Sequence, residues 1–218
     1  MTRRAERRRW SATGGRVFDI VIATVILIVT AFPLAVATLV VATCLGRPVL
    51  FRQERIGLHG APFTIVKLRT MRPFDPARGL STDASRLTRF GVFLRATSID
   101  ELPSLVNVLR GEMSIVGPRP LPVTYGPRFT GSEKRRHEVR PGLTGLAQVH
   151  GRNALSWEDR FRLDVEYVDR CSVLLDFRIL LRTAGVVLRA RGITAAGCAT
   201  MHELRPEHGP VPGPAVRT

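Results

Sequence analysis

Residues 20 to 46 form a run of 27 residues without a single charged side chain. As a straight helix this run would be roughly 40 Å long, whereas the hydrocarbon core of a bilayer is about 30 Å thick. A secretory signal peptide has a shorter apolar stretch, and here the run leads directly into the basic sequence RPVLFRQER. The sequence therefore predicts a membrane-embedded helix over residues 16–46, preceded by a basic segment at residues 1–15.

Positive charge flanks this helix on both sides, although it normally marks only the cytoplasmic side. The flanking arginines are Arg3, Arg4, Arg7, Arg8, Arg9 and Arg16 before it, and Arg47, Arg52 and Arg55 after it. Pro33 lies at the midpoint, where it removes a helix hydrogen bond and favours a kink. We therefore favour a re-entrant helix whose two arms, each about 20 Å long, return to the same face. An ordinary spanning helix with a tolerated proline is the alternative.

The remaining composition points to an anionic partner. Lys and Arg number 33 against 18 Asp and Glu, a formal charge of +15. Nucleic acid, an acidic membrane surface and a phosphorylated small molecule all fit that balance. Three widely spaced cysteines and five scattered histidines match neither a disulfide framework nor a zinc site.

The rest of the chain is predicted to be a mainly helical α+β domain at residues 47–191. Residues 48–57 and 62–70 are expected to form a β-hairpin with Lys67 and Arg69 on one face of its second strand. Residues 102–111 and 156–169 are expected to be helices. Residues 114–122 form a predicted proline-rich loop, and residues 140–152 a glycine-punctuated loop or strand. Residues 172–192 are predicted to be a helix on the membrane surface or in the core, and residues 192–218 a disordered tail.

The adjacent acids Asp100 and Glu101 have two readings. Ser98 and Glu101 match the S-x-x-E capping box, in which the acids only stabilise a helix N-terminus. Pro103 weakens this reading, because it would fall just past the positions where a missing N–H is harmless.

The surrounding cations favour chemistry instead. They are Lys67, Arg69, Arg95, Arg110 and Arg119, the last in the stiff Gly-Pro-Arg-Pro turn at residues 117–120. Arginine suits phosphate recognition, and two carboxylates among phosphate-binding cations indicate phosphoryl transfer. One acid can act as a nucleophile, and the other can hold a divalent cation, for which oxygen ligands favour Mg²⁺.

At this point the chain resembles a known family. The matching motifs are KLRTM at residues 67–71, RLTRFGVFLRATSIDELPSLVNVLRGEMSIVGPRP at 86–120, RPGLTGLAQVHGR at 140–152, LDVEYVDRCSVLLDFRILLRT at 163–183 and the anchor sequence at 16–36. Together they resemble the bacterial monotopic phosphoglycosyl transferases, over roughly residues 14 to 190. Several ordered motifs at matching intervals are far more specific than one signature.

The resemblance implies transfer of a phosphosugar from a nucleoside diphosphate sugar, usually a UDP-sugar, to polyprenyl phosphate with release of UMP. It implies that Asp100 is the nucleophile that forms a covalent phosphosugar intermediate, that Glu101 binds Mg²⁺ and that Arg119 binds phosphate. Lys67, Arg69 and Arg95 match basic motif positions. Arg140 is a candidate for the nucleotide end, with a structural role for its loop as the alternative.

The resemblance also implies a re-entrant anchor in the bacterial inner membrane, with the catalytic domain on the cytoplasmic face, in the first membrane step of exopolysaccharide or glycoconjugate assembly. The chain corresponds to the minimal catalytic form, and it has Phe32 before the mid-anchor Pro33 where many relatives have a small polar residue. Expected partners are the nucleotide sugar, polyprenyl phosphate and membrane lipids, without nucleic acid; a homo-oligomer stays open. The rival readings are a lipid-phosphate glycosyl transferase that releases UDP, and a membrane-tethered basic adaptor for anionic lipid or nucleic acid.

Overall fold

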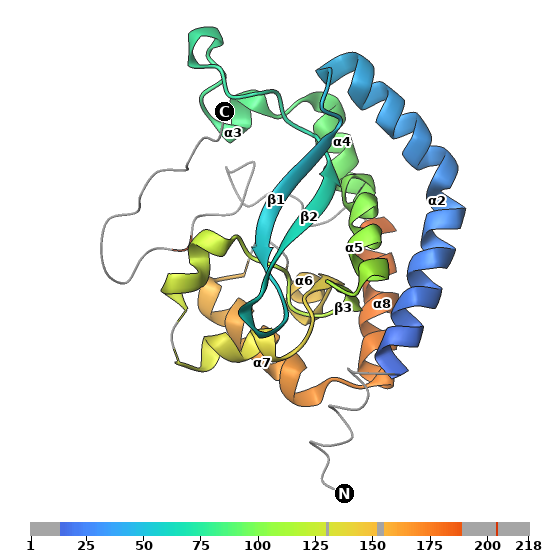
Figure 1. The fold of residues 1–218 in the computed structure, drawn as a ribbon, viewed down its shortest axis with the longest axis vertical. Helices are drawn as coiled ribbons and strands as arrows, with labels where there is room; N and C mark the ends of the chain where they lie inside the picture. The colour runs from blue at the N-terminus through green and yellow to red at the C-terminus, as the bar shows by residue number, and fades with distance from the viewer. Residues whose placement is uncertain (1–13, 130, 152–154, 189–203, 205–218) are drawn as a thin grey trace, which may run out of the picture.

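The computed structural model describes residues 14–129, 131–151, 155–188 and 204. The predicted basic segment 1–15 and tail 192–218 therefore lie outside the described residues, apart from residues 14, 15 and 204. In chain order the elements are α2 (Gly15–Leu45), β1 (Leu50–Ile56), η2 (Leu58–Gly60), β2 (Pro62–Leu68), η3 (Pro76–Arg78), α3 (Asp83–Arg86), α4 (Arg89–Thr97), η4 (Ile99–Ser104), α5 (Leu105–Arg110), β3 (Ser114–Val116), η5 (Val123–Arg128), η6 (Gly131–Glu138), β4 (Gly142–Thr144), α6 (Leu146–His150), α7 (Trp157–Arg170) and α8 (Val173–Leu188). Helices dominate, and the predicted mixture of helices with a small amount of sheet is confirmed (Figure 1).

The predicted hairpin is present. Strands β1 and β2 pair antiparallel, from Leu50 opposite Leu68 to Ile56 opposite Pro62. The outer edge of β2 is covered by two buried polar side chains rather than by a third strand. Ser104 donates to the carbonyl of Val66 at 2.8 Å, and the Asn107 amide donates to Thr64 at 2.8 Å and accepts from the Val66 N–H at 3.2 Å. These bonds satisfy backbone groups of an edge strand and set the position of β2 relative to η4 and α5.

A second pair of strands was not predicted. Residues 114–116, expected to begin a rigid loop, form β3, which pairs in parallel with β4. The backbones beside this pair approach closely: a Cβ on Gly142 would lie 2.1 Å from the Gly117 nitrogen, and one on Gly145 would lie 2.1 Å from the Gly117 oxygen. For residues 114–116 the prediction of a loop was wrong, because a three-residue strand shows no periodicity of its own. Its pairing partner lies 28 residues away along the chain, in the segment 140–152 that was left open as a loop or a strand.

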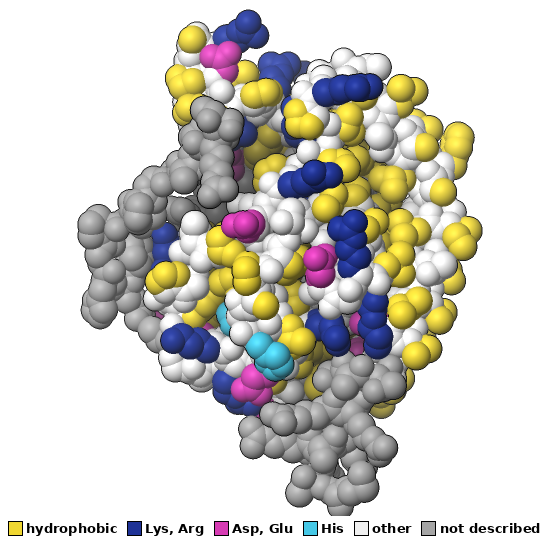
Figure 2. Space-filling view, viewed as in Figure 1, with side chains coloured by type: hydrophobic (Ala, Val, Ile, Leu, Met, Phe, Trp, Pro, Cys, Tyr) yellow, Lys and Arg dark blue, Asp and Glu magenta, His cyan; other side chains and the backbone are white. Residues whose placement is uncertain are grey.

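Helix α2 is one uninterrupted helix that contains Pro33 and bows along one side of the domain (Figure 1). In the described part of the chain it is the one helix long and apolar enough to cross a membrane. Its outer face exposes large apolar side chains, with Phe32, Val29 and Ile28 between 71% and 80% exposed. Figure 2 shows these hydrophobic side chains gathered along the edge that α2 forms. Such a surface is expected to lie in lipid.

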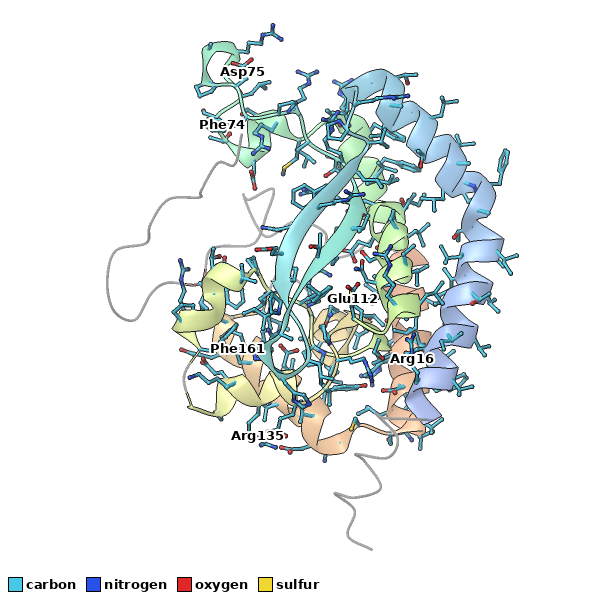
Figure 3. All side chains as sticks on the ribbon, viewed as in Figure 1. Arg16, Phe74, Asp75, Glu112, Arg135 and Phe161 are labelled. Atoms are coloured by element: carbon cyan, nitrogen blue, oxygen red, sulfur yellow. The ribbon has the colours of Figure 1, made fainter. Side chains whose placement is uncertain are left out.

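Polar bonds hold the N-terminal half of α2 against the domain. The Arg16 guanidinium donates to the carbonyls of Val108 and Leu109 at the end of α5 (Figure 3). Asp19, only 4% exposed, accepts from the Ser114 hydroxyl and the Ile115 N–H, both at 2.8 Å. The anchor is therefore part of the folded unit rather than an appendage on a linker.

The predicted charged helix is confirmed as α7, which begins after the N-cap Ser156. Helix α8 combines features of both readings made for it. Ile179 is 1% exposed and Asp176 accepts from the Tyr167 hydroxyl at 2.8 Å on the core side. On the other side, four large apolar side chains are 51–60% exposed: Val173, Leu174, Phe177 and Leu181.

Replacing Asn107 with Ala is expected to lower the free energy of unfolding by about 2–4 kcal/mol, because it removes three hydrogen bonds of a fully buried side chain, with the Val66 N–H, the Thr64 carbonyl and the Glu112 carboxylate. For a chain of this size that corresponds to a loss of roughly 4–16 °C in Tm, measured by thermal denaturation in detergent. Ser85→Ala removes only exposed hydrogen bonds and serves as the control. Equal Tm values for the two variants would contradict the role given to Asn107.

Candidate active site

The acidic pair lies on η4, the short 3₁₀ helix that follows α4. Ser98 does not cap η4 with its side chain; it has left-handed backbone angles (φ 58°) and ends α4, its N–H bonding to the Arg95 carbonyl. The capping-box interpretation of Ser98 and Glu101 is therefore wrong. The tight turn at Ser98 instead starts η4 in a new direction, and the side chains of Asp100 and Glu101 are free for tertiary contacts.

Glu101 is held by two cations from different parts of the chain. Lys67 on β2 lies 2.6 Å from Glu101 Oε1, and Arg119 lies 2.5 Å from the same oxygen. Burial alone would raise the pKa of Glu101, but the charges of Arg119 and Lys67 outweigh it and hold that pKa well below its usual range. These two cations therefore favour the ionised form of the Glu101 carboxyl group.

Asp100 has the opposite electrostatic character. Its side chain is buried, and burial together with the neighbouring charge of Glu101 raises its pKa to about 7. The cations Lys67, Arg95 and Arg119 oppose this shift without cancelling it. The two adjacent acids therefore have pKa values pushed far apart, which is typical of carboxylates with separate roles in catalysis.

A buried ion pair that was not predicted from the sequence holds the Gly-Pro-Arg-Pro turn in place. Arg136 and Asp164 are 2% and 1% exposed, and Arg136 Nη2 lies 2.7 Å from the Asp164 carboxylate. The same guanidinium donates to the Arg119 carbonyl at 2.7 Å and lies over the rings of Phe129 and Phe161. This arrangement fixes the backbone that carries Arg119.

Of the five cations to which the family resemblance gives a place in the site, three lie around the acids. Lys67 and Arg119 bind Glu101, and Arg95 interacts with Asp100 while its Nε donates to the Thr70 hydroxyl at 3.1 Å. The other two, Arg69 and Arg140, have contacts elsewhere.

Arg69 donates to the carbonyls of Leu45 and Gly46, where it caps the C-terminus of α2. Arg140 Nε donates to the Gly111 carbonyl at 2.9 Å, at the end of α5. These contacts agree with the alternative reading in which the loop of Arg140 is structural.

Arg55 joins the site without having been predicted there. A small pocket is lined by Arg55, Lys67, Glu101 and Arg119, closed by Ile65, Met113 and the backbone around Gly142. In the sequence Arg55 counted only as one of the arginines after the anchor. No local pattern could have placed it here, because its position depends on pairing between β1 and the Pro120–Pro122 segment.

The side chains at this site provide only some of the ligands that a divalent cation needs. The described residues contain no cluster of three or more His, Cys, Asp or Glu side chains. Glu101 Oε1 is occupied by Lys67 and Arg119, whereas Oε2 receives only a 3.4 Å contact from Arg119. Mg²⁺ is usually held by one or two carboxylates together with substrate phosphates. Glu101 Oε2 fits that mode of binding and not a site built from protein ligands alone.

An open apolar groove of about 1040 Å³ runs along α2 to the start of β1. It is lined by Leu27, Leu34, Ala35, Leu39 and Val49, with Arg47 at its end. An aliphatic chain with a phosphate headgroup would match this combination of an apolar wall and a terminal cation.

Replacing Asp100 with Asn is expected to stabilise the protein at alkaline pH. Since the folded state raises the pKa of Asp100 from 3.8 to about 7, its ionisation costs folding free energy as the pH rises through that interval. The advantage of Asp100→Asn should be absent near pH 4, grow up to about pH 7 and reach about 2–4 kcal/mol above it. Thermal denaturation from pH 4 to 8.5 measures this difference.

Asp159→Asn is the matched control. The pKa of the exposed Asp159 is lowered by its hydrogen bonds with Arg162 and Ser156, so its loss should bring no gain at high pH. A stabilisation by Asp100→Asn that does not change with pH would contradict the raised pKa.

Comparison with known proteins identifies the family of the chain. The model of the bacterial sugar transferase family matches residues 10–190. The chain is 50% identical over 179 residues to the "Uncharacterized sugar transferase EpsL" of Bacillus subtilis, covering 82% of this chain and 89% of that protein. It is 42% identical over 186 residues to the "UDP-glucose:undecaprenyl-phosphate glucose-1-phosphate transferase" of Caulobacter vibrioides, covering 79% and 69%.

An Escherichia coli protein with that same name is 38% identical over 179 residues, which are 77% of this chain but 39% of that longer relative. The family model extends over the anchor, the acidic pair and the arginine turn. The chain therefore belongs to the bacterial sugar transferase family of phosphoglycosyl transferases.

Proposed function

We propose that this protein transfers a sugar 1-phosphate from a UDP-sugar to polyprenyl phosphate, releasing UMP, through a covalent aspartyl phosphosugar on Asp100. The observation that carries the proposal is the division between the two acids: Glu101 is neutralised by Lys67 and Arg119, whereas Asp100 is buried beside it with a raised pKa. The names of the relatives from Caulobacter vibrioides and Escherichia coli supply the class of donor and acceptor.

In the first step a carboxylate oxygen of Asp100 attacks the phosphorus that carries the sugar. The new bond is an acyl phosphate, and the bond from that phosphorus to the bridging oxygen breaks, so that UMP leaves with the electron pair. In the second step an oxygen of the lipid phosphate attacks the same phosphorus and releases the Asp100 carboxylate. A covalent intermediate allows an aqueous donor and a membrane acceptor to use one small site in turn.

The cations around the acids suit this chemistry. Arg119 and Lys67 can share the charge of Glu101 with the donor diphosphate, and Arg95 lies on the side of Asp100. Held near a reacting phosphoryl group, they stabilise charge that develops on its oxygens. Mg²⁺, held by Glu101 Oε2 and donor phosphates, would neutralise diphosphate charge.

The nucleotide product tests this proposal. Purified protein is incubated with polyprenyl phosphate, Mg²⁺ and a panel of UDP-sugars, and the released nucleotide is identified by chromatography. We expect repeated turnover to UMP that depends on the lipid, is abolished by excess EDTA and falls at least about 10³-fold in Asp100→Asn. Release of UDP would instead indicate transfer of the sugar without its phosphate.

The pH dependence of the rate tests the role of Asp100 separately. The nucleophile must be ionised, and its pKa is raised to about 7. The value of kcat/KM should therefore rise about tenfold per pH unit below pH 7 and level off above it. A flat profile between pH 5.5 and 8 would contradict attack by Asp100.

The same proposal includes a re-entrant anchor in the bacterial inner membrane, with both ends of α2 on the cytoplasmic face. The arginines on both flanks and the contacts of Arg16 and Arg69, which fasten both ends of α2 to one domain, support it. A helix that spanned the bilayer would have to hold these two ends on opposite sides.

Cysteine labelling tests this topology. In a variant without the native cysteines, Gly14→Cys and Arg47→Cys are each treated with a membrane-impermeant maleimide in intact spheroplasts and after lysis. Both positions should react only after lysis. Labelling of one position in intact spheroplasts would indicate a spanning helix.

A further inference from the structure

Arg55 has a position that its place in the sequence does not suggest. It lies near the end of β1, where the Ile56 N–H bonds to the Leu121 carbonyl at 2.9 Å. Its own guanidinium donates to the Pro120 carbonyl at 3.1 Å, directly beside Arg119. The side chain therefore lies under the arginine turn and lines the same small pocket as Lys67, Glu101 and Arg119.

The charge in this pocket is unbalanced. Lys67, Arg119 and Arg55 contribute three positive charges, and Glu101 is the one carboxylate among the described residues that line it. Lys67 and Arg119 both bind Glu101, whereas the hydrogen bonds of Arg55 go to two neutral acceptors, the Pro120 carbonyl and the Gln53 amide oxygen. An anion of about two negative charges would complete this set of cations.

The guanidinium of Arg55 also has unused donor capacity. Its Nε is buried and has no hydrogen-bond partner in the part of the chain that the structure describes. Burial, reinforced by repulsion from Arg119, lowers the pKa of Arg55 to about 10. An anion that binds in this pocket would accept a hydrogen bond from the buried Nε and would stabilise the positive charge of the guanidinium.

The pocket lies on the Glu101 side of the acidic pair. Asp100 and Arg95 interact with each other but do not line the pocket, whereas Arg55 interacts with Arg119, Glu101 and Tyr125. The cations thus extend in one series, from Arg95 beside Asp100 through Arg119 to Arg55. A diphosphate in this series would have one phosphorus near Asp100 and the other near Arg55.

We propose that Arg55, together with Arg119, forms the subsite for the phosphate that leaves with the nucleoside. This proposal rests on the proposed function, in which the phosphorus nearer Asp100 is attacked and the farther phosphate departs in UMP. Arg55 would then bind the donor through its α-phosphate and stabilise the negative charge that develops on the leaving oxygen.

The test measures binding of two probes, UMP and inorganic pyrophosphate, by titration calorimetry on the full-length protein in nanodiscs. The variants are Arg55→Gln, Arg55→Lys and the control Arg52→Gln, which removes the same charge from an exposed position on the same strand. Arg55→Gln should weaken binding of both probes about 10- to 100-fold. Arg55→Lys should recover part of this loss, because Lys keeps the charge but not the two-pronged geometry, and Arg52→Gln should bind like the wild type.

A stability measurement separates binding from a purely structural role. Without ligand, Arg55→Gln should keep or raise the Tm because it removes an unbalanced buried charge. The rise in Tm caused by saturating UMP should shrink in the same variant. A lower Tm without ligand, combined with unchanged probe affinities, would show that Arg55 only supports the arginine turn, and would overturn the proposal.

The two probes also distinguish this proposal from the proposed function. If the wild type binds pyrophosphate but not UMP, the nucleotide product assigned above is contradicted, while the loss of pyrophosphate binding in Arg55→Gln still decides the role of Arg55. If the wild type binds neither probe, both proposals are overturned.

Discussion

The ion pairs that join Glu101 to Lys67 and Arg119 hold three separate parts of the chain together at one point. Lys67 comes from the hairpin, Glu101 from η4 and Arg119 from the proline-rich turn, so the carboxylate connects segments that span more than fifty residues. An ionised carboxylate that is mostly removed from water is stable only with such partners. The same charge raises the pKa of Asp100 next to it. One interaction therefore both assembles the site and makes the two acids chemically different.

Polar contacts also hold the anchor helix α2 in place. Its long apolar face is suited to a lipid environment, whereas polar side chains bind both of its ends to the catalytic domain: Arg16 and Asp19 at one end, Arg69 at the other. These contacts satisfy backbone groups of α5, β3 and the end of α2, which would otherwise need water or another partner. Because α2 and the acidic pair belong to one packed unit, the depth of the helix in the membrane also sets the height of Asp100 above it. The apolar side chains exposed on α8 are consistent with a domain that rests against the bilayer.

Local patterns predicted those parts of the fold that local forces determine. The uncharged run, the hairpin and the charged helix α7 all have a period or a length that a reader of the sequence can recognise. Strand β3 was missed because it consists of three residues and exists only through its pairing with β4. The capping box was one of two readings of the acidic pair, but Ser98 ends the preceding helix in a left-handed conformation that the S-x-x-E pattern does not reveal.

The residues of the candidate site also fall into two groups: those that local sequence patterns indicate, and those whose role depends on contacts with distant segments. Asp100, Glu101, Lys67 and Arg119 lie together, as the charged residues in ordered motifs predicted, while their roles in phosphoryl chemistry stay a prediction. Asn107, Arg136 and Asp164 could not be predicted, because each is a polar residue whose importance comes from burial against a distant segment. Arg69 and Arg140 resemble their neighbours in sequence, yet their partners are the backbone carbonyls at the ends of α2 and α5. Positive charge in a motif does not by itself indicate which anion or carbonyl it binds.

The central claim is that Asp100 forms a covalent bond to the phosphosugar, and direct trapping tests it most sharply. Wild-type protein and Asp100→Asn are mixed with an excess of the preferred UDP-sugar and Mg²⁺ in the absence of polyprenyl phosphate, quenched within seconds and digested for mass spectrometry. If Asp100 is the nucleophile, we expect one equivalent of UMP per wild-type protein and a phosphosugar mass increase on the peptide that contains Asp100, neither of which occurs in the variant. Efficient transfer to lipid without any modified peptide, or modification at another residue, would contradict it.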